Sequence, residues 1–396
     1  MSAIWRLQIL FFGTGSIFYA TNILAVYIAL YLLLMPYKFW ISIPIFIILA
    51  LCPVFFGLAP IVWKDVFLAS LVFLSASIAI NRITVNGKIE KKYKIISLVL
   101  LLVASLVRAN APFITAPLIV LFLIGWDNRF KSILISGIAA IGLIGISGPI
   151  NNHLLGARQS HPLISLEVYD LAGVSNFSGK LQVPGTYSTD EQQRILNSCY
   201  SSTHWDVYAW GECAFVTENL NRNGLGSAWL RAILNNPLAY FEHRVSHFND
   251  FLRFIGNEPA YKYYVSVPPG YQSDNPQRIN ATHQYYTRLM ERYNSQPWHY
   301  GFVWYAISIG LFIATFKPKN TIENLINCLS FASFLYISGY LIVGVAADFR
   351  YFLPAVYLLI ASTVVLAGYA RTILLSKQGL IGIATTLAII STGVLL

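Results

Sequence analysis

Long apolar runs separated by short polar segments dominate the chain. These runs cover residues 8–34, 41–59, 66–80, 95–107, 113–125, 132–150, 301–316, 325–344, 351–370 and 379–396. A helix needs about 20 mainly apolar residues to cross a hydrocarbon layer ~30 Å thick. The runs are too uniformly apolar for the alternating strands of a barrel, so helices are the structure that satisfies their backbone in lipid. We therefore predict an all-α polytopic membrane protein with about ten membrane helices.

Composition and charge agree with this class. Of the 396 residues, 56% are hydrophobic and 11% are charged, whereas about 25% of residues are charged in soluble proteins. The net charge of +10 does not indicate a nucleic-acid partner, because Lys and Arg gather in short loops beside apolar runs, as the positive-inside rule describes. The residues in these loops are Arg82, Lys88, Lys91, Lys92, Lys94, Arg129, Lys131, Lys317, Lys319, Arg371 and Lys377.

A segment of different composition separates the apolar runs into two groups. Residues 151–300 carry twelve of the seventeen acidic residues and several turn-rich stretches, and they are numerous enough for a small folded unit. We predict three parts: an N-terminal transmembrane region at 1–150, a mainly α-helical extracytoplasmic (periplasmic) domain at 151–300, and a C-terminal transmembrane region at 301–396.

The clearest element of the inserted domain is a helix that begins at Asn236-Pro237, an N-cap followed by proline at the first helical position, and ends at Gly256. Its apolar residues recur every three or four positions: Leu238, Phe241, Val245, Phe248, Leu252 and Ile255. This stripe indicates either a helix in the membrane interface or one packed within the domain.

The side of the membrane on which the domain lies depends on residues 95–125. A single tilted span would place the domain in the cytoplasm, whereas a hairpin of two short helices places it outside. A single span would hold Arg108 near the middle of the membrane, where the free energy of inserting an arginine is unfavourable by about 2.5–3.5 kcal/mol. Pro112 and Pro117 would also interrupt its helix. We therefore favour the hairpin, with Arg108, Asn110 and Pro112 at its polar tip.

The cysteines fall into two classes. Cys52 and Cys328 lie in apolar runs and are expected to be inert. Cys199 and Cys213 are the pair within the inserted domain, and outside the cytoplasm we expect them to form a disulfide. The alternatives are two free thiols in a cytoplasmic domain, or a zinc site with His204, for which no second ligand pair has structural-zinc spacing.

Two histidines four residues apart, His243 and His247, share a face of the predicted helix. The segment His-Arg-Val-Ser-His lacks the glutamate of a hydrolytic His-Glu-x-x-His site. We interpret the pair as a polar helix face rather than as metal ligands, and predict no metal site. Aromatic residues of the domain are candidates for stacking on sugar rings or for a hydrophobic core: Tyr200, Trp205, Tyr208, Trp210, Trp229 and Tyr240.

Candidate chemistry gathers at one end of the apolar runs. Two carboxylates there stand next to cations, in Trp63-Lys64-Asp65 and in Asp348-Phe349-Arg350-Tyr351, and Arg108 belongs to the same face. Ionisable groups at membrane depth tend to mark function, although interfacial snorkelling or plain ion pairing would also explain them.

The residue types in this set suit a phosphate. Arginine presents a planar fork that matches phosphate oxygens, and lysine supplies a compact charge. Lys64, Arg108 and Arg350 could therefore neutralise the charge that develops on a leaving polyprenyl phosphate as its sugar is transferred. A carboxylate, Asp65 or Asp348, could take the proton from the acceptor hydroxyl.

Several stretches resemble the GT-C superfamily of membrane glycosyltransferases, particularly the bacterial glucosyltransferases that decorate O-antigen. The stretches are Trp63 to Phe67, Arg108 to Pro112, Pro162 to Ser175, Trp229 to Arg244, and Asp348 to Pro354. The last is similar to an Arg-Tyr-x-x-Pro stretch found at an outer span start in many such enzymes.

This resemblance implies a hexosyltransferase of the bacterial inner (cytoplasmic) membrane. It implies a polyprenyl-phosphate-sugar donor, an outer-face active site and a glycan or lipid-linked acceptor, with a divalent cation as an open question. The expected donor-phosphate residues are Lys64, Arg108, Arg350 and Tyr351, and the expected substrate or acceptor contacts are Trp63, Asn110 and Trp205. The expected catalytic residues are Asp65 and Asp348.

One departure from the resemblance concerns the acidic residue. Relatives usually have a first span followed by a long outer loop with an essential acid, and here an apolar run follows Met1 almost directly. Either an N-terminal portion is lacking, or Asp65, less favourably Asp348, takes that role. The competing functions are a transporter or flippase of lipid-linked saccharides, a polymerase or ligase of O-antigen, and a non-catalytic membrane component. Charges confined to one face argue against transport, which needs a pathway to both sides.

Overall fold

The described residues fold mainly into helices. The computed structural model describes residues 9–10, 17–156, 162–256, 288, 296–374 and 376–395. Within these ranges no strand of a sheet occurs, and the β-pairs are two isolated bridges, Gly185 with Leu220 and His204 with Ala346. The chain divides into two compact units. We call Met1–Ala157, Pro259–Tyr336 and Phe349–Leu396 the membrane unit, and Arg158–Glu258 with Ile337–Asp348 the inserted unit.

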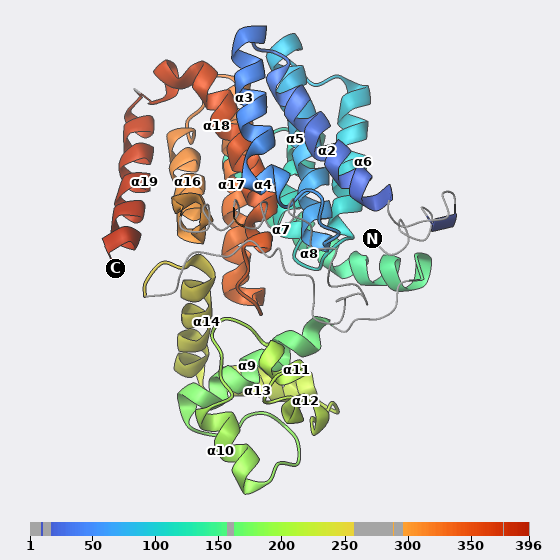
Figure 1. The fold of residues 1–396 in the computed structure, drawn as a ribbon, viewed down its shortest axis with the longest axis vertical. Helices are drawn as coiled ribbons and strands as arrows, with labels where there is room; N and C mark the ends of the chain where they lie inside the picture. The colour runs from blue at the N-terminus through green and yellow to red at the C-terminus, as the bar shows by residue number, and fades with distance from the viewer. Residues whose placement is uncertain are drawn as a thin grey trace. The chain divides into compact units, whose positions relative to one another are not determined.

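The membrane unit is a bundle of long apolar helices (Figure 1). Its N-terminal elements are α2 (Ile17–Leu34), α3 (Phe39–Leu51), α4 (Pro53–Phe56), α5 (Lys64–Asn86), α6 (Lys91–Ser105), α7 (Pro112–Ile124), α8 (Arg129–Pro149) and η1 (Ile150–Leu154). Its C-terminal elements are η4 (Pro297–His299), α16 (Gly301–Ala314), most of α17 (Thr321–Val343), η5 (Phe349–Phe352), α18 (Leu353–Leu374) and α19 (Lys377–Leu395).

Six helices of the described residues are long and apolar enough to cross a membrane, which makes the chain a multi-pass membrane protein. They are Ile17–Leu34, Lys64–Asn86, Arg129–Leu154, Thr321–Val343, Phe349–Gly368 and Lys377–Val394. Three further apolar helices are shorter: Phe39–Leu51, Pro112–Ile124 and Gly301–Ala314. Most of the predicted apolar runs correspond to helices among the described residues, and the run 41–59 is divided into α3 and α4. The expected number of about ten spans is not confirmed.

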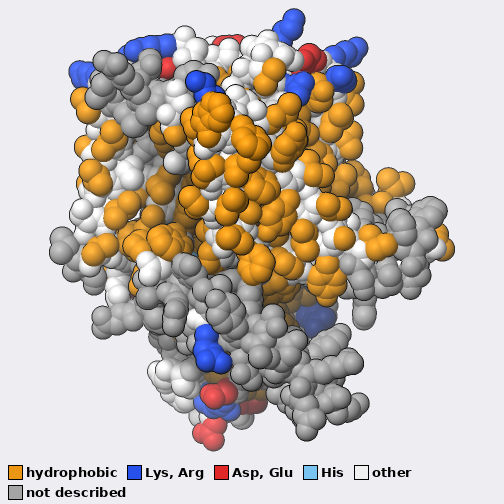
Figure 2. Space-filling model, turned by 45° about the horizontal axis from the view of Figure 1, so that its top comes forward, with side chains coloured by type: hydrophobic (Ala, Val, Ile, Leu, Met, Phe, Trp, Pro, Cys, Tyr) orange, Lys and Arg blue, Asp and Glu red, His pale blue; other side chains and the backbone are white. Residues whose placement is uncertain are grey.

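Helix α5 forms the centre of the membrane unit. In the apolar stretch of α5 that is long enough to cross a membrane, 83% of the residues are buried, whereas 11% are buried in the corresponding stretches of Arg129–Leu154 and Lys377–Val394. The surface of the unit is accordingly a broad hydrophobic face, with Lys and Arg side chains gathered along one edge (Figure 2). This arrangement is typical of a bundle whose outer helices face lipid and whose basic loops flank the hydrocarbon layer.

The chain is broken between α6 and α7, within residues 95–125. Helix α6 ends at Ser105, and α7 begins at Pro112. The hydroxyls of Ser105 and Thr115 lie 2.7 Å apart across the turn. Residues 95–125 therefore form two helices, and Arg108 lies in the turn between them.

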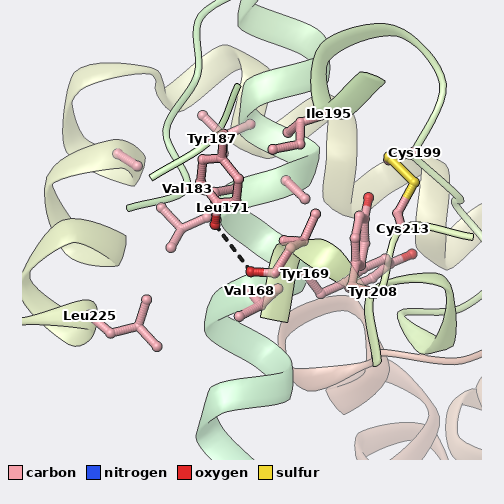
Figure 3. Close-up of a cluster of buried hydrophobic side chains, with 14 of the residues drawn as sticks. Val168, Tyr169, Leu171, Val183, Tyr187, Ile195, Cys199, Tyr208, Cys213 and Leu225 are labelled. Atoms are coloured by element: carbon pink, nitrogen blue, oxygen red, sulfur yellow. Dashed lines mark hydrogen bonds between the residues drawn. A yellow bond between two sulfur atoms is a disulfide. The ribbon is translucent and has the colours of Figure 1, made fainter. Parts of the chain in front are cut away.

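The inserted unit packs short helices around one apolar core. These elements are α9 (Pro162–Ser178), α10 (Thr189–Asn197), α11 (Asp206–Ala209), α12 (Phe215–Glu218), α13 (Leu225–Asn235), α14 (Pro237–Leu252) and the last residues of α17. Figure 3 shows the core beside α9, where the hydroxyl of Tyr187 donates a hydrogen bond to the backbone oxygen of Val216 at 3.1 Å. The predicted disulfide joins Cys199 and Cys213, and both of these cysteines belong to the core.

Candidate functional site

Three segments that are distant in the sequence bring their charges together in the membrane unit. Asp65 lies in the first turn of α5, Arg108 in the turn between α6 and α7, and Arg350 in η5. Arg108 forms an ion pair with Oδ1 of Asp65, and Nε of Arg350 lies 3.9 Å from Oδ2 of the same carboxylate. The two oxygens of Asp65 are thus divided between two guanidinium groups. We call Asp65, Arg108, Arg350 and the aromatic residues Trp63 and Tyr351 the open cluster.

Aromatic rings hold the guanidinium groups in place. The ring of Tyr351 lies 4.7 Å from the guanidinium carbon of Arg108 and 5.0 Å from that of Arg350. Arg350 also lies 4.7 Å from the ring of Trp63 and donates a hydrogen bond to the Tyr351 hydroxyl at 3.0 Å. Cations over aromatic faces at this distance are attracted by the ring quadrupole. The two arginines are therefore fixed in orientation by rings as well as by the carboxylate.

Local sequence explains why each segment presents its charge at this place. Trp63 is extended (φ −111°, ψ 149°) as the N-cap of α5, and an acidic residue in a first helical turn is favoured by the helix dipole. Pro112 occupies the first turn of α7, where its missing N–H is tolerated, so the chain turns before it at Arg108. Phe349 and Phe352 are buried and anchor η5 on either side of Arg350.

The open cluster is partly exposed at the surface. Two arginines face one aspartate, and the exposed Lys64 adjoins that aspartate along the chain. The side chains of Arg108 and Arg350 are 25% and 30% exposed, whereas that of Asp65 is 7% exposed. Guanidinium groups held rigidly at a partly exposed surface suit an anion with several oxygen atoms, such as a phosphate.

Three further predicted site residues are Asn110, Trp205 and Asp348. Asn110 is buried in the same turn as Arg108, where its backbone oxygen accepts a hydrogen bond from the amide of Phe113 at 3.2 Å. Trp205 and Asp348 belong to the inserted unit. Trp205 packs edge-on against the exposed Trp210, with the ring centroids 6.0 Å apart. The structure therefore brings together Trp63, Asp65, Arg108, Arg350 and Tyr351 from the predicted set.

A second charged cluster, which the sequence did not reveal, lies inside the inserted unit. Asp170 of α9 forms an ion pair with Arg244 of α14. Its carboxylate also lies 3.2 Å from Nε2 of His243 and accepts a hydrogen bond from the Trp229 indole at 2.7 Å. We call Asp170, Trp229, His243 and Arg244 the sealed cluster, because the side chains of Asp170 and Arg244 are 0% and 4% exposed.

The polar face of α14 that carries His243 and His247 is buried. Nδ1 of His247 lies 2.7 Å from the backbone oxygen of Ser202, and burial lowers the pKa of this histidine from 6.5 to about 3. Burial also lowers the pKa of His243, against the opposing effect of its hydrogen bond with Asp170. Both imidazoles are therefore neutral at neutral pH.

The aromatic candidates of the inserted unit divide between the core and the surface. Tyr208 is fully buried in the core, whereas Trp210 is exposed. Neither the zinc site with His204 nor a metal pair at His243 and His247 gains support. Within the described ranges, no group of three or more His, Cys, Asp and Glu side chains is placed to hold a metal ion.

Comparison with known proteins adds no relative. A scan against protein-family models, a search of curated proteins and a search of solved structures each returned no match. The geometry of the two clusters is therefore the ground on which a function can be proposed.

Proposed function

We propose that this protein is a membrane glycosyltransferase that takes a sugar from a polyprenyl-phosphate donor. The acceptor is a cell-surface glycan or a lipid-linked saccharide at the outer face of the membrane. The open cluster is the observation that supports this proposal, because two fixed guanidinium groups at a partly exposed surface match the phosphate of such a donor.

Arg108 and Arg350 bind the donor phosphate in this proposal. In the structure Asp65 holds both cations. An incoming phosphate draws one arginine away from the carboxylate of Asp65. The phosphate then neutralises that arginine, and Asp65 neutralises the other. Binding energy is then directed at the oxygen atoms on which negative charge grows as the sugar leaves.

The transfer step displaces the phosphate from the anomeric carbon. The acceptor hydroxyl oxygen forms a bond to that carbon, the bond from carbon to phosphate oxygen breaks, and its electron pair leaves with the polyprenyl phosphate. The hydroxyl proton passes to a carboxylate acting as general base. We propose Asp65 for this role, because the arginine that moves to the phosphate frees one of its oxygen atoms. Asp348 is the alternative base.

Trp63 and Tyr351 act through the arginines. Both rings lie against Arg350, so they orient the guanidinium group. Trp63, which the sequence suggested as a sugar contact, lies with its ring against Arg350. Lys64, which is exposed at the start of α5, adds positive charge for donor attraction, in line with its predicted role.

Sugar transfer in proteoliposomes tests the proposal. The donor is radiolabelled undecaprenyl-phosphate glucose, the acceptor is a cell-envelope glycan extract, and the variants are Asp65→Asn, Asp348→Asn, Arg108→Gln and Arg350→Gln. We expect the arginine variants and Asp65→Asn to lose transfer by a factor of about 10² to 10³. Addition of EDTA tests the open question of a divalent cation.

Two controls make the assay decisive. Lys317→Gln removes an exposed cation from a distant loop of the same unit and is expected to leave transfer unchanged. Full activity in both aspartate variants would remove Asp65 and Asp348 from the site. If the donor crosses the bilayer and no sugar is transferred, the protein is a flippase and not a glycosyltransferase.

A further inference from the structure

Helix α14 is turned with its polar side inward and its apolar side outward. His243, Arg244 and His247 are buried, whereas Leu238, Phe241 and Val245 are 77%, 63% and 42% exposed. Of the predicted apolar stripe, Leu252 is the buried residue. A surface helix of a soluble domain shows the opposite arrangement. The stripe of Leu238, Phe241 and Val245, which we call the α14 stripe, therefore needs an explanation.

The orientation of α14 is fixed by its buried contacts. Arg244 pairs with Asp170 and donates a hydrogen bond to the backbone oxygen of Gly344 at 2.7 Å. His247 contacts Ser202, and His243 packs so closely on α9 that a Cβ at Gly173 would lie 2.2 Å from its ring. Rotating the helix to bury the stripe would break these contacts and leave buried charge unpaired. The exposed stripe is thus a built feature of the fold.

The neighbours of α14 indicate what covers the stripe. Phe251 of α14 stacks on Tyr340 of α17, with ring centroids 4.3 Å apart and an interplanar angle of 13°. Arg244 binds Gly344, the residue after the end of α17. Helix α17 is a candidate membrane span. These two contacts attach α14 to the C-terminal end of a candidate membrane span.

We propose that the α14 stripe docks on the lipid bilayer, at the boundary between headgroups and acyl chains. The partner is the membrane surface itself, recognised through burial of leucine, phenylalanine and valine side chains. An interfacial helix with its apolar face inserted about 5–10 Å into this boundary has this pattern. The adjoining helix α13 presents Leu230 and Leu234, which are also exposed. The interaction is apolar, so it persists at high salt, which screens exposed charges.

Fluorescence quenching by lipid tests the inference in the full-length protein. Single cysteines are introduced at Leu238, Phe241 or Val245 in a Cys52→Ala/Cys328→Ala background, which keeps the disulfide, and are labelled with bimane. The protein is reconstituted in nanodiscs of phosphatidylcholine and phosphatidylglycerol that carry a nitroxide near the top of the acyl chain. The matched control is Gln193→Cys, on the exposed side of α10 in the same unit.

We expect bimane on the α14 stripe to be quenched at least about twofold more strongly than bimane at Gln193. The difference is expected to persist in high salt. Because the substituted side chains are exposed, each variant is expected to fold, and three positions give independent readings. Equal quenching at the stripe and at Gln193 overturns the inference, whether another protein surface or water covers the stripe. Loss of the difference in high salt also overturns it, because the docking would then be electrostatic.

Discussion

The open cluster and the sealed cluster combine the same groups and differ in their access to solvent. Each holds an aspartate against arginine, with aromatic side chains alongside. The arginines of the open cluster are 25% and 30% exposed, whereas Arg244 of the sealed cluster is 4% exposed. The open cluster has two arginines for one aspartate. The sealed cluster has one, with neutral histidine beside it.

This difference separates a binding role from a structural one. A sealed ion pair has no route to a ligand, and removing one partner leaves an uncompensated buried charge. A partly exposed pair can exchange its carboxylate for an incoming anion. We therefore expect substitutions in the sealed cluster to act on folding and those in the open cluster to act on transfer.

The largest expected effect comes from Arg244→Leu. This change strands the buried carboxylate of Asp170 and is expected to destabilise the inserted unit by about 3–5 kcal/mol. Hydrogen exchange of peptides from α9 and α14, measured in the full-length protein, reports the loss. The matched control is Arg231→Leu, at an exposed position of α13, which is expected to change stability by less than about 0.5 kcal/mol. Equal exchange in both variants would contradict a structural role for the sealed cluster.

Removal of the disulfide is expected to have a somewhat smaller effect. Cys199 and Cys213 are 14 residues apart in the sequence, and closing a loop of this size contributes about 3 kcal/mol in the chain-entropy model. The variant Cys199→Ser/Cys213→Ser should therefore unfold the inserted unit at a lower temperature and leave the membrane unit unaffected. Thermal unfolding followed by exchange in α10 and α11 measures this. A variant as stable as the wild type would show that the core alone holds these helices.

Acidification is expected to weaken the inserted unit. His247 has a pKa of about 3 when folded, against 6.5 as the ordinary value, so the unfolded chain binds more protons between these pH values. Stability from this residue is complete above about pH 6.5 and falls as the pH is lowered toward 3. His243 acts in the same direction.

The measurement is the unfolding temperature of the inserted unit at about pH 7.5 and about pH 5. His247→Gln removes one titrating group and should reduce the difference between the two temperatures. An unchanged difference would mean that the acid sensitivity arises elsewhere.

The smallest expected effect on stability belongs to the open cluster. Arg108→Gln leaves Asp65 in contact with Arg350, and the lost guanidinium is partly exposed. An exposed ion pair contributes about 0.2–1 kcal/mol, so unfolding of the membrane unit should change by no more than this. Hydrogen exchange in α5 and α7 checks it. A loss as large as that of Arg244→Leu would erase the distinction between the two clusters.

The helices could be predicted from apolar runs, and their exact lengths could not. The break at Pro53 after α3 lies within the apolar run 41–59 and was not predicted, whereas Arg108 and Pro112 did indicate the break before α7. The convergence of Asp65, Arg108 and Arg350 was expected from chemistry alone, because spacing along the chain does not fix which helix ends meet. The structure supplies that convergence.

The sealed cluster could not be predicted, because each of its residues has an ordinary local setting. Periodicity leaves open whether the apolar side of α14 lies in the membrane interface or packs within the domain, and it assigns His243 only to a polar helix face. The polar side of α14 is buried because Arg244 forms an ion pair with Asp170 and donates a hydrogen bond to the backbone oxygen of Gly344. In the sequence, Gly173 marks the place where α9 closely approaches α14. A single glycine does not reveal which helix packs against it.

The most direct test of the central claim is binding of radiolabelled polyprenyl phosphate to the reconstituted protein. We predict that Arg108→Gln and Arg350→Gln each weaken binding by about tenfold or more, because each removes a charge-assisted hydrogen bond of about 1.5–3 kcal/mol. Lys317→Gln should bind as the wild type does. Undiminished binding in both arginine variants would contradict the assignment of the open cluster to a phosphate.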